Sequence, residues 1–181
     1  MLFRSGIGDG AAFTCAALKL ECKIVMGYPG TNEAALATIR GEADSIYLSD
    51  ISALNFTKPG MNLPFYVLSR ERTKLYPDVP TIYESTKVDE DGQWLLDYRA
   101  NIETLGRILV APPAMAAGRL AHLRGAVKTA LTDPALVAES GRTGFLVTYG
   151  DAAETQKLTQ SVISDLTAEQ KERIRKIVVR D

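Results

Sequence analysis

The chain contains 181 residues, and its 21 Lys and Arg against 22 Asp and Glu give a formal net charge of −1. This length accommodates one domain or two small ones, and 46% hydrophobic with 24% charged residues is a globular composition. A net charge this close to zero gives no electrostatic reason to expect nucleic acid or an anionic membrane as a partner. The most apolar stretch, residues 108–117, contains Pro112 and Pro113 and is far shorter than the ~20 residues that span a membrane.

The N-terminus and the two cysteines bear on the compartment in which the protein acts. No charged region followed by an apolar one opens the chain, so we expect no signal peptide, which on its own favours a cytoplasmic protein. Cys15 and Cys22 fall in one predicted helix, where their separation of ~10 Å exceeds the roughly 7 Å that a disulfide allows. We therefore expect both to be packing residues. With one histidine and no close cysteine pair, we expect no metal site.

Short β-like runs alternate with helical patterns along the chain, which is typical of α/β proteins. The predicted strands cover residues 2–4, 23–26, 45–48, 64–69, 107–111 and 145–148. The predicted helices cover residues 11–21, 32–41, 52–56, 94–105, 115–131, 134–141, 152–165 and 168–179. Helix start signals at Asp133, Asp151 and Thr167 precede the last three of these helices. The polar segment 85–93 is expected to be a surface loop.

A glycine-rich segment follows the first predicted strand at once and leads into the first predicted helix. Its alternating glycines would let the backbone approach a ligand closely, and the helix that follows presents free N–H groups to an anion. The residues that could take part are Ser5, Gly6, Gly8, Asp9 and Gly10. A tight turn without a ligand is the alternative interpretation. Because a domain rarely opens on its functional loop, we expect further sequence before Met1.

Two more polar segments lie at strand-to-helix junctions. Gly30 and Thr31 precede the second predicted helix, and Thr31 could either cap that helix or direct its hydroxyl toward a ligand. Ser49 and Asp50 follow the third predicted strand. Ligands of open α/β sheets bind at the carboxyl ends of the strands, so the three segments together predict a binding cleft.

The sequence contains little that indicates catalysis. His122, the single histidine, lies off the apolar face of its predicted helix and is expected to be solvated. Trp94, Tyr98 and Arg99 share a helix and are expected to form a packing face. No serine occupies a nucleophile elbow, so we expect a binding protein without enzymatic activity, cofactor or metal.

Several motifs occur together in an order that resembles a known family. They are GYPGT at 27–31, AAL at 34–36, RGEAD at 40–44, SAL at 52–54, PDVPT at 77–81, LVAPP at 109–113, DPAL at 133–136 and LTAEQKER at 166–173. This set resembles the second lobe and C-terminal segment of the tripartite tricarboxylate transporter solute receptors. The similarity extends from about residue 2 to the end of the chain.

The resemblance implies a type II periplasmic-binding-protein fold, in which two α/β lobes, each a central sheet flanked by helices, close on a small carboxylate. The receptor would act in the periplasm, or another extracytoplasmic compartment, and deliver its ligand to membrane permease subunits. The implied ligand contacts are Ser5, Gly6, Gly8 and Gly10 in one loop, Gly30 and Thr31 in the next, and Ser49 and Asp50 in a third. Asp9 departs from the family pattern, because its carboxylate would repel an anionic ligand. The Asp9 side chain would either point away from the ligand or, like Asp50, neutralise an ammonium group of the ligand. An amino acid is therefore an alternative ligand.

The resemblance also implies how the chain is organised. Residues 1–105 would form the second ligand-binding lobe. Residues 106–181 would supply the return strand and C-terminal helices of a first lobe whose N-terminal half, with a signal peptide, precedes this sequence in family members. The helices beyond Met115 would then expose apolar surface, which a homodimer could cover.

Two other functions remain open at this point. One is a nucleotide-dependent α/β enzyme that uses the loop of Gly6, Gly8 and Gly10. This match to the dinucleotide fingerprint is weak, because no acidic residue ends the next predicted strand to hold a ribose. The other is the effector-sensing domain of a transcriptional regulator, which shares the two-lobed architecture and would require a DNA-binding segment upstream.

Overall fold

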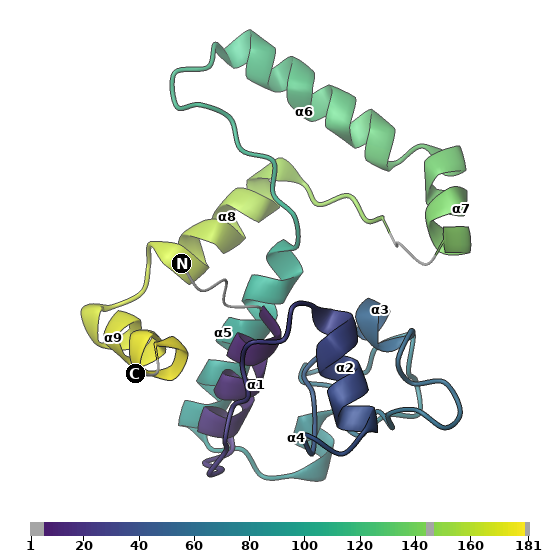
Figure 1. Cartoon of the computed structure of the whole chain (residues 1–181). Helices are drawn as coiled ribbons and strands as arrows, with labels where there is room; N and C mark the ends of the chain where they lie inside the picture. The colour runs from purple at the N-terminus through teal and green to yellow at the C-terminus, as the bar shows by residue number, and fades with distance from the viewer. Residues whose placement is uncertain (1–5, 144–146, 180–181) are drawn as a thin grey trace. The chain divides into compact units, whose positions relative to one another are not determined.

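The computed structural model of the chain describes residues 6–143 and 147–179. The predicted strand at 2–4, Ser5 and the first half of the predicted strand at 145–148 lie outside the described residues. The described part forms the helices drawn in Figure 1: α1 (Gly6–Ala17), α2 (Thr31–Ile39), α3 (Asp50–Ala53), α4 (Ile82–Ser85), α5 (Glu90–Leu105), α6 (Ala117–Leu131), α7 (Pro134–Thr143), α8 (Ala152–Ile163) and α9 (Ala168–Val178). They divide between two compact units: unit 1 comprises Met1–Asn101 with Thr167–Asp181, and unit 2 comprises Ile102–Leu166.

The predicted α/β fold with a central sheet is wrong. Helices make up 54% of the described residues, and in the same ranges the β structure amounts to one isolated parallel bridge between Val67 and Thr81. Parallel strands need neighbours that satisfy their N–H and C=O groups and helices that cover both faces. The other predicted strands in these ranges have neither, and Leu109 and Val110, which a sheet would bury, are 80% and 88% exposed. These segments are therefore connections between helices.

The helix predictions were more accurate than the strand predictions, since every predicted helix overlaps an observed one. Thr167 forms a capping box with Gln170, as expected, and Asp151 accepts hydrogen bonds from the first backbone N–H groups of α8. The Asp133 carboxylate likewise accepts from the N–H groups of Ala135 and Leu136. These starts were predictable because a cap depends on residues two or three positions apart. Helix α4 was not predicted, although Thr81 and Glu84 form a capping box at its start.

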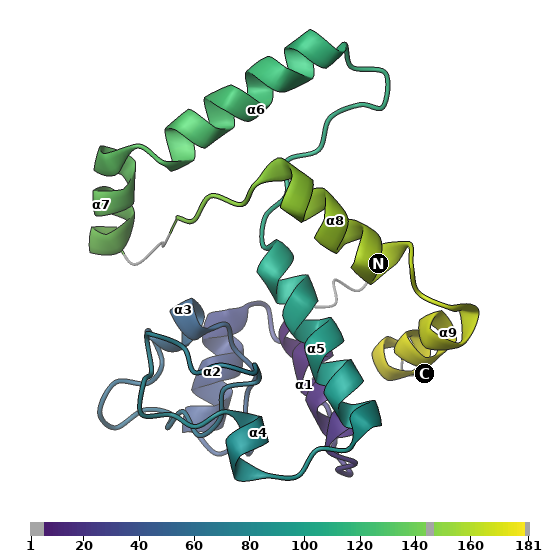
Figure 2. The same ribbon diagram turned by 180° about the vertical axis from the view of Figure 1, so that it is seen from behind.

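The hydrophobic core of unit 1 lies among α1, α4, α5 and α9. Its buried members are Phe13, Ala17, Ile82, Val88, Leu95 and Leu96. Figures 1 and 2 show α1 lying along α5, and side chains of α9, including Ile174 and Ile177, pack against the same cluster. The C-terminal helix thus completes the core that the N-terminal helix begins.

The expected packing face on α5 is confirmed. The Trp94 and Tyr98 rings stack with centroids 5.7 Å apart, and Phe13 of α1 lies 5.7 Å from Tyr98. Arg173 of α9 places its guanidinium 5.5 Å from the centroid of the Trp94 ring and pairs with the Asp91 carboxylate. A cation above an aromatic face is attracted to the ring quadrupole, so this contact ties α9 to α5.

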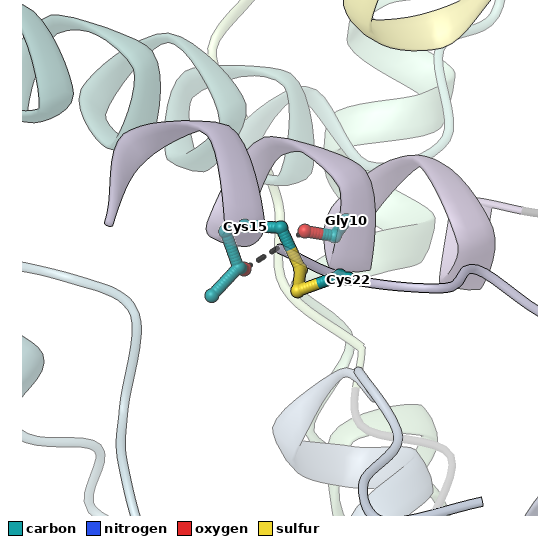
Figure 3. The surroundings of a disulfide bond; sticks show 4 residues. Gly10, Cys15 and Cys22 are labelled. Atoms are coloured by element: carbon teal, nitrogen blue, oxygen red, sulfur yellow. Dashed lines mark hydrogen bonds between the residues drawn. A yellow bond between two sulfur atoms is a disulfide. The ribbon is translucent and has the colours of Figure 1, made fainter. Parts of the chain in front are cut away.

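Cys15 and Cys22 form a disulfide, which corrects our expectation that they could not (Figure 3). The prediction assumed that the helix expected over 11–21 continues to Cys22, but α1 ends at Ala17. Lys19 then takes a positive φ of 55°, and the N–H of Leu20 donates to the carbonyl of Cys15. This turn folds the chain back so that the two Cα atoms lie 6.2 Å apart. The disulfide therefore closes a short loop at the C-terminal end of α1.

Unit 2 contains the end of α5, from residue 102, together with α6, α7 and α8. Its described helices bury only two side chains fully, Ser140 and Val162, and α6 has no buried residue. Leu123, Leu136 and Val137 are exposed. The expectation of exposed apolar surface beyond Met115 is therefore confirmed, and the predicted solvated position of His122 is also found. None of the helices in the described ranges combines the length and apolar character that crossing a bilayer requires.

Candidate functional site

The segment predicted to be a glycine-rich loop is the beginning of α1, which corrects its local structure. Glycine costs about 1 kcal/mol relative to alanine inside a helix, so three of them in the first two turns need a reason. Gly8 and Gly10 are both buried. A Cβ on Gly8 would lie 2.4 Å from the Sδ atom of Met26, and one on Gly10 would lie 2.3 Å from the Tyr47 ring. These glycines permit close approach of other parts of the chain to α1.

Arg99 of α5 lies at the same end of α1 and is only 7% exposed. Its Nη2 atom donates a hydrogen bond of 3.1 Å to the carbonyl of Gly6, and its guanidinium lies 5.2 Å from the centroid of the Tyr47 ring. The arginine thus places a positive charge beside the N-terminal end of α1, which already favours anions through its backbone dipoles. Asp9 lies in the first turn of the same helix, so this end of unit 1 carries a carboxylate as well as the arginine.

Gly30 and Thr31 lie at the start of α2. Gly30 is the N-cap, so the expectation that Thr31 could cap the helix is wrong, and no side chain caps the first turn of α2. Gly30 is exposed and Thr31 partly exposed. Within the described ranges the Thr31 hydroxyl makes no hydrogen bond to protein. The first N–H groups of α2 and this hydroxyl are therefore available to a ligand.

Ser49 and Asp50 have structural roles at the start of α3. The Ser49 hydroxyl accepts a hydrogen bond from the backbone N–H of Ser52, as an N-cap does. One Asp50 oxygen accepts from the N–H of Ile51 at 2.8 Å, and the other accepts from the Thr73 hydroxyl at 2.7 Å. Asp50 thus anchors the loop that contains Thr73. These contacts account for both residues without a ligand.

The structure brings only part of the predicted set together. Met26 and Tyr47, which precede the second and third predicted segments, both lie against the glycine face of α1. Arg99 joins this cluster through Gly6 and Tyr47. Sequence reasoning missed Met26 and Tyr47 and assigned Arg99 to packing alone. An arginine within an otherwise apolar helix face was the one signal that could have singled it out.

This cluster combines a buried arginine, two glycines packed against side chains and the N-terminal end of a helix. In residues 6–143 and 147–179, no three or more His, Cys, Asp or Glu side chains come together in a way that could hold a metal ion. The helical conformation of Gly6–Gly10, with Gly8 and Gly10 buried against side chains, also removes the open backbone loop that a dinucleotide-binding enzyme would require.

Comparison with known protein families assigns the chain. The family model described as tripartite tricarboxylate transporter family receptor matches residues 6–178. The chain belongs to this family. As a receptor of this kind it is an extracytoplasmic solute-binding protein of a tripartite transporter, a class of binding receptors that work with membrane permease components. The receptor matches no curated protein and no solved structure.

Proposed function

We propose that the protein captures a small carboxylate outside the cytoplasm, in the periplasm, and delivers it to the permease of a tripartite tricarboxylate-type transporter. The family match over residues 6–178 is the observation that carries this proposal. The Cys15–Cys22 disulfide supports the location, because structural disulfides persist in oxidising compartments such as the periplasm and are rare in the cytosol.

The proposed carboxylate contacts are the accessible members of the predicted set. Thr31 would donate its hydroxyl, and the N–H groups at the start of α2 would bind the carboxylate oxygens. Gly6 and its partner Arg99 would provide favourable electrostatics at the start of α1. Gly8 and Gly10, which are buried, would position α1 against Met26 and Tyr47 and would not touch the ligand.

Binding to the full chain can be measured by isothermal titration calorimetry with citrate, succinate and glutamate. At least one of these ligands should bind, and Thr31→Val should weaken it about tenfold, the effect of one lost hydrogen bond to a charged group. Thr129→Val, on the exposed surface of α6, is the matched control and should leave the affinity unchanged. Failure of every dicarboxylate, tricarboxylate and amino acid to bind would refute the proposal.

We further propose that the receptor pairs with a second copy through the apolar side chains of unit 2. Leu109 and Val110 are nearly fully exposed and follow one another in the chain, so an antiparallel pairing of this segment with its copy would bury both. Light scattering should give twice the chain mass, and Val110→Lys should reduce it to the monomer mass. A monomer at high protein concentration would contradict the pairing.

A further inference from the structure

A cavity of 380 Å³ lies in unit 1 beside the C-terminal end of α1, away from the site discussed above. Its apolar wall includes Leu18, Leu20, Tyr66 and Ile82, and three charged side chains, Lys19, Lys87 and Asp89, line the rest. Helix α1 extends over 12 residues, so at 1.5 Å per residue this cavity lies roughly 16 Å from Gly6. It is therefore separate from the predicted carboxylate contacts.

The charges lining the cavity do not cancel. Lys19 pairs with Asp89 at 2.5 Å, which raises the pKa of Lys19 and lowers that of Asp89, so both stay ionised. Lys87 has neither an ion-pair nor a hydrogen-bond partner within the described ranges. The cavity therefore offers one uncompensated ammonium group beside a carboxylate that already has its partner.

The apolar wall is held in place by its neighbours. Tyr66 is partly exposed and contacts Phe65 edge to face, with centroids 5.1 Å apart, and Ile82 below it belongs to the core. Leu20 lies within the loop that the Cys15–Cys22 disulfide closes, and its N–H is hydrogen-bonded to the carbonyl of Cys15. The backbone of the wall is thus fixed at Leu20 and Ile82, and the exposed side chains of Leu20 and Tyr66 offer apolar surface to a ligand.

We propose that this cavity binds an organic monoanion: a carboxylate attached to an aromatic or branched hydrocarbon body. The ammonium of Lys87 pairs with the carboxylate, and the hydrocarbon packs on Leu20, Tyr66 and Ile82. Lys19 is already paired with Asp89, so a second carboxylate would find no free cation in the cavity and would lie against apolar side chains, which excludes dicarboxylates and tricarboxylates. The cavity volume lies at the lower end of the range for small-molecule sites, which suits an acid with one ring.

Phenylacetate is a suitable probe for this site. Titration of the ¹⁵N-labelled full chain should shift the amide signals of Leu20, Ile82 and Thr86, which line the cavity. Succinate, as a dicarboxylate, should leave those three signals in place. Benzyl alcohol, which keeps the ring but lacks the charge, should bind at least about tenfold more weakly than phenylacetate, in keeping with the loss of a charge-assisted contact.

Variants separate this site from the one proposed for transport. Lys87→Gln should weaken phenylacetate binding about tenfold, whereas Lys58→Gln, at another exposed lysine of unit 1, should not change it. Thr31→Val should leave phenylacetate binding intact. The inference is overturned if phenylacetate shifts none of the three cavity signals, if Lys87→Gln binds it as the wild type does, or if succinate produces the same shifts.

Discussion

The helical glycines of the two units have opposite surroundings. In unit 1, a Cβ on Gly92 would lie 2.3 Å from the carbonyl oxygen of Ala17, and Gly8 and Gly10 are similarly crowded. In unit 2, Gly118 and Gly125 of α6 would meet nothing within 4 Å. The first set lets helices approach closely, and the second packs against nothing among the described residues.

This contrast extends to the whole of each unit. Unit 1 has a continuous apolar cluster to which α1, α4, α5 and α9 contribute, and a disulfide. Unit 2 buries little along its described helices. Because burial of apolar surface is the main driving force of folding, the stability of the isolated chain should reside in unit 1. The single tryptophan, Trp94, lies in that unit and reports on it alone.

The largest expected effect comes from truncating a core leucine. Leu95 is 1% exposed and Leu123 is 43% exposed. Leu95→Ala should destabilise unit 1 by about 2–5 kcal/mol, because it removes buried methyl groups and leaves a cavity. Leu123→Ala should shift the same transition by less than about 0.5 kcal/mol. Urea unfolding followed by Trp94 fluorescence measures both. Equal shifts would mean that α6 packs as tightly as α5.

Removal of the disulfide should have the next largest effect. The bridge closes a loop of about eight residues, and the chain-entropy relation gives about 2–3 kcal/mol for a loop of that size. The Cys15→Ser/Cys22→Ser double variant should therefore lower the urea midpoint of the Trp94 transition. In this variant the helices of unit 2, which the disulfide does not contact, should unfold at the wild-type urea midpoint when they are followed by far-ultraviolet circular dichroism. If dithiothreitol leaves the wild-type fluorescence transition unchanged, the bridge contributes no stability.

The helices could be predicted from the sequence, but the strands could not, and the reason is the range of the interactions. Asp133 and Thr167 mark helix starts through contacts with residues two or three positions away. A strand exists only if a partner pairs with it, and residues 23–26 and 107–111 contain the right side chains but have no strand partner in the part of the chain that the structure describes. Alternation of apolar and polar residues cannot reveal that absence.

The candidate site was predictable only in part for the same reason. Gly8 and Gly10 stood out as glycines, but their packing against Met26 and Tyr47 depends on distant residues. The contact between Arg99 and Gly6 spans 93 positions. The disulfide was missed because the turn at Lys19 was not foreseen. The lobe boundary at residues 105 and 106, and ligand binding by the predicted set, stay predictions.

Alanine substitution of the glycines sharpens the comparison between the units. Gly125→Ala should stabilise α6 by up to about 1 kcal/mol, because alanine has the higher helix propensity and nothing lies near the new Cβ. Gly92→Ala should destabilise unit 1 by about 1–3 kcal/mol, since a backbone carbonyl cannot move aside as a flexible side chain can. Thermal unfolding by circular dichroism, with Trp94 fluorescence in parallel, distinguishes the two. A stabilising Gly92→Ala would show that α1 and α5 are not in close contact.

The smallest expected effect concerns acid. Hydrogen bonds from Arg72 and from the backbone of Thr81 lower the pKa of Glu84 to about 2 from its ordinary 4.5. Since the pKa is lower in the folded state, the ionised carboxylate stabilises unit 1 above about pH 4.5, and this contribution is lost as the pH falls from there toward 2. Glu84→Gln keeps the capping geometry of α4 but cannot titrate. The urea midpoint of this variant, followed by Trp94 fluorescence, should therefore fall less steeply than that of the wild type between pH 4.5 and 2.

Arg72→Gln tests the cause of that shift. It removes the larger of the two influences on Glu84 and leaves the Thr81 backbone hydrogen bond in place. Its pH dependence should lie between those of the wild type and Glu84→Gln. Helix α4 contributes Ile82 to the core of unit 1, so this pH dependence should be seen in the unfolding transition that Trp94 fluorescence follows. If the wild type and Glu84→Gln lose stability in parallel between pH 4.5 and 2, the ion pair does not hold α4 in place.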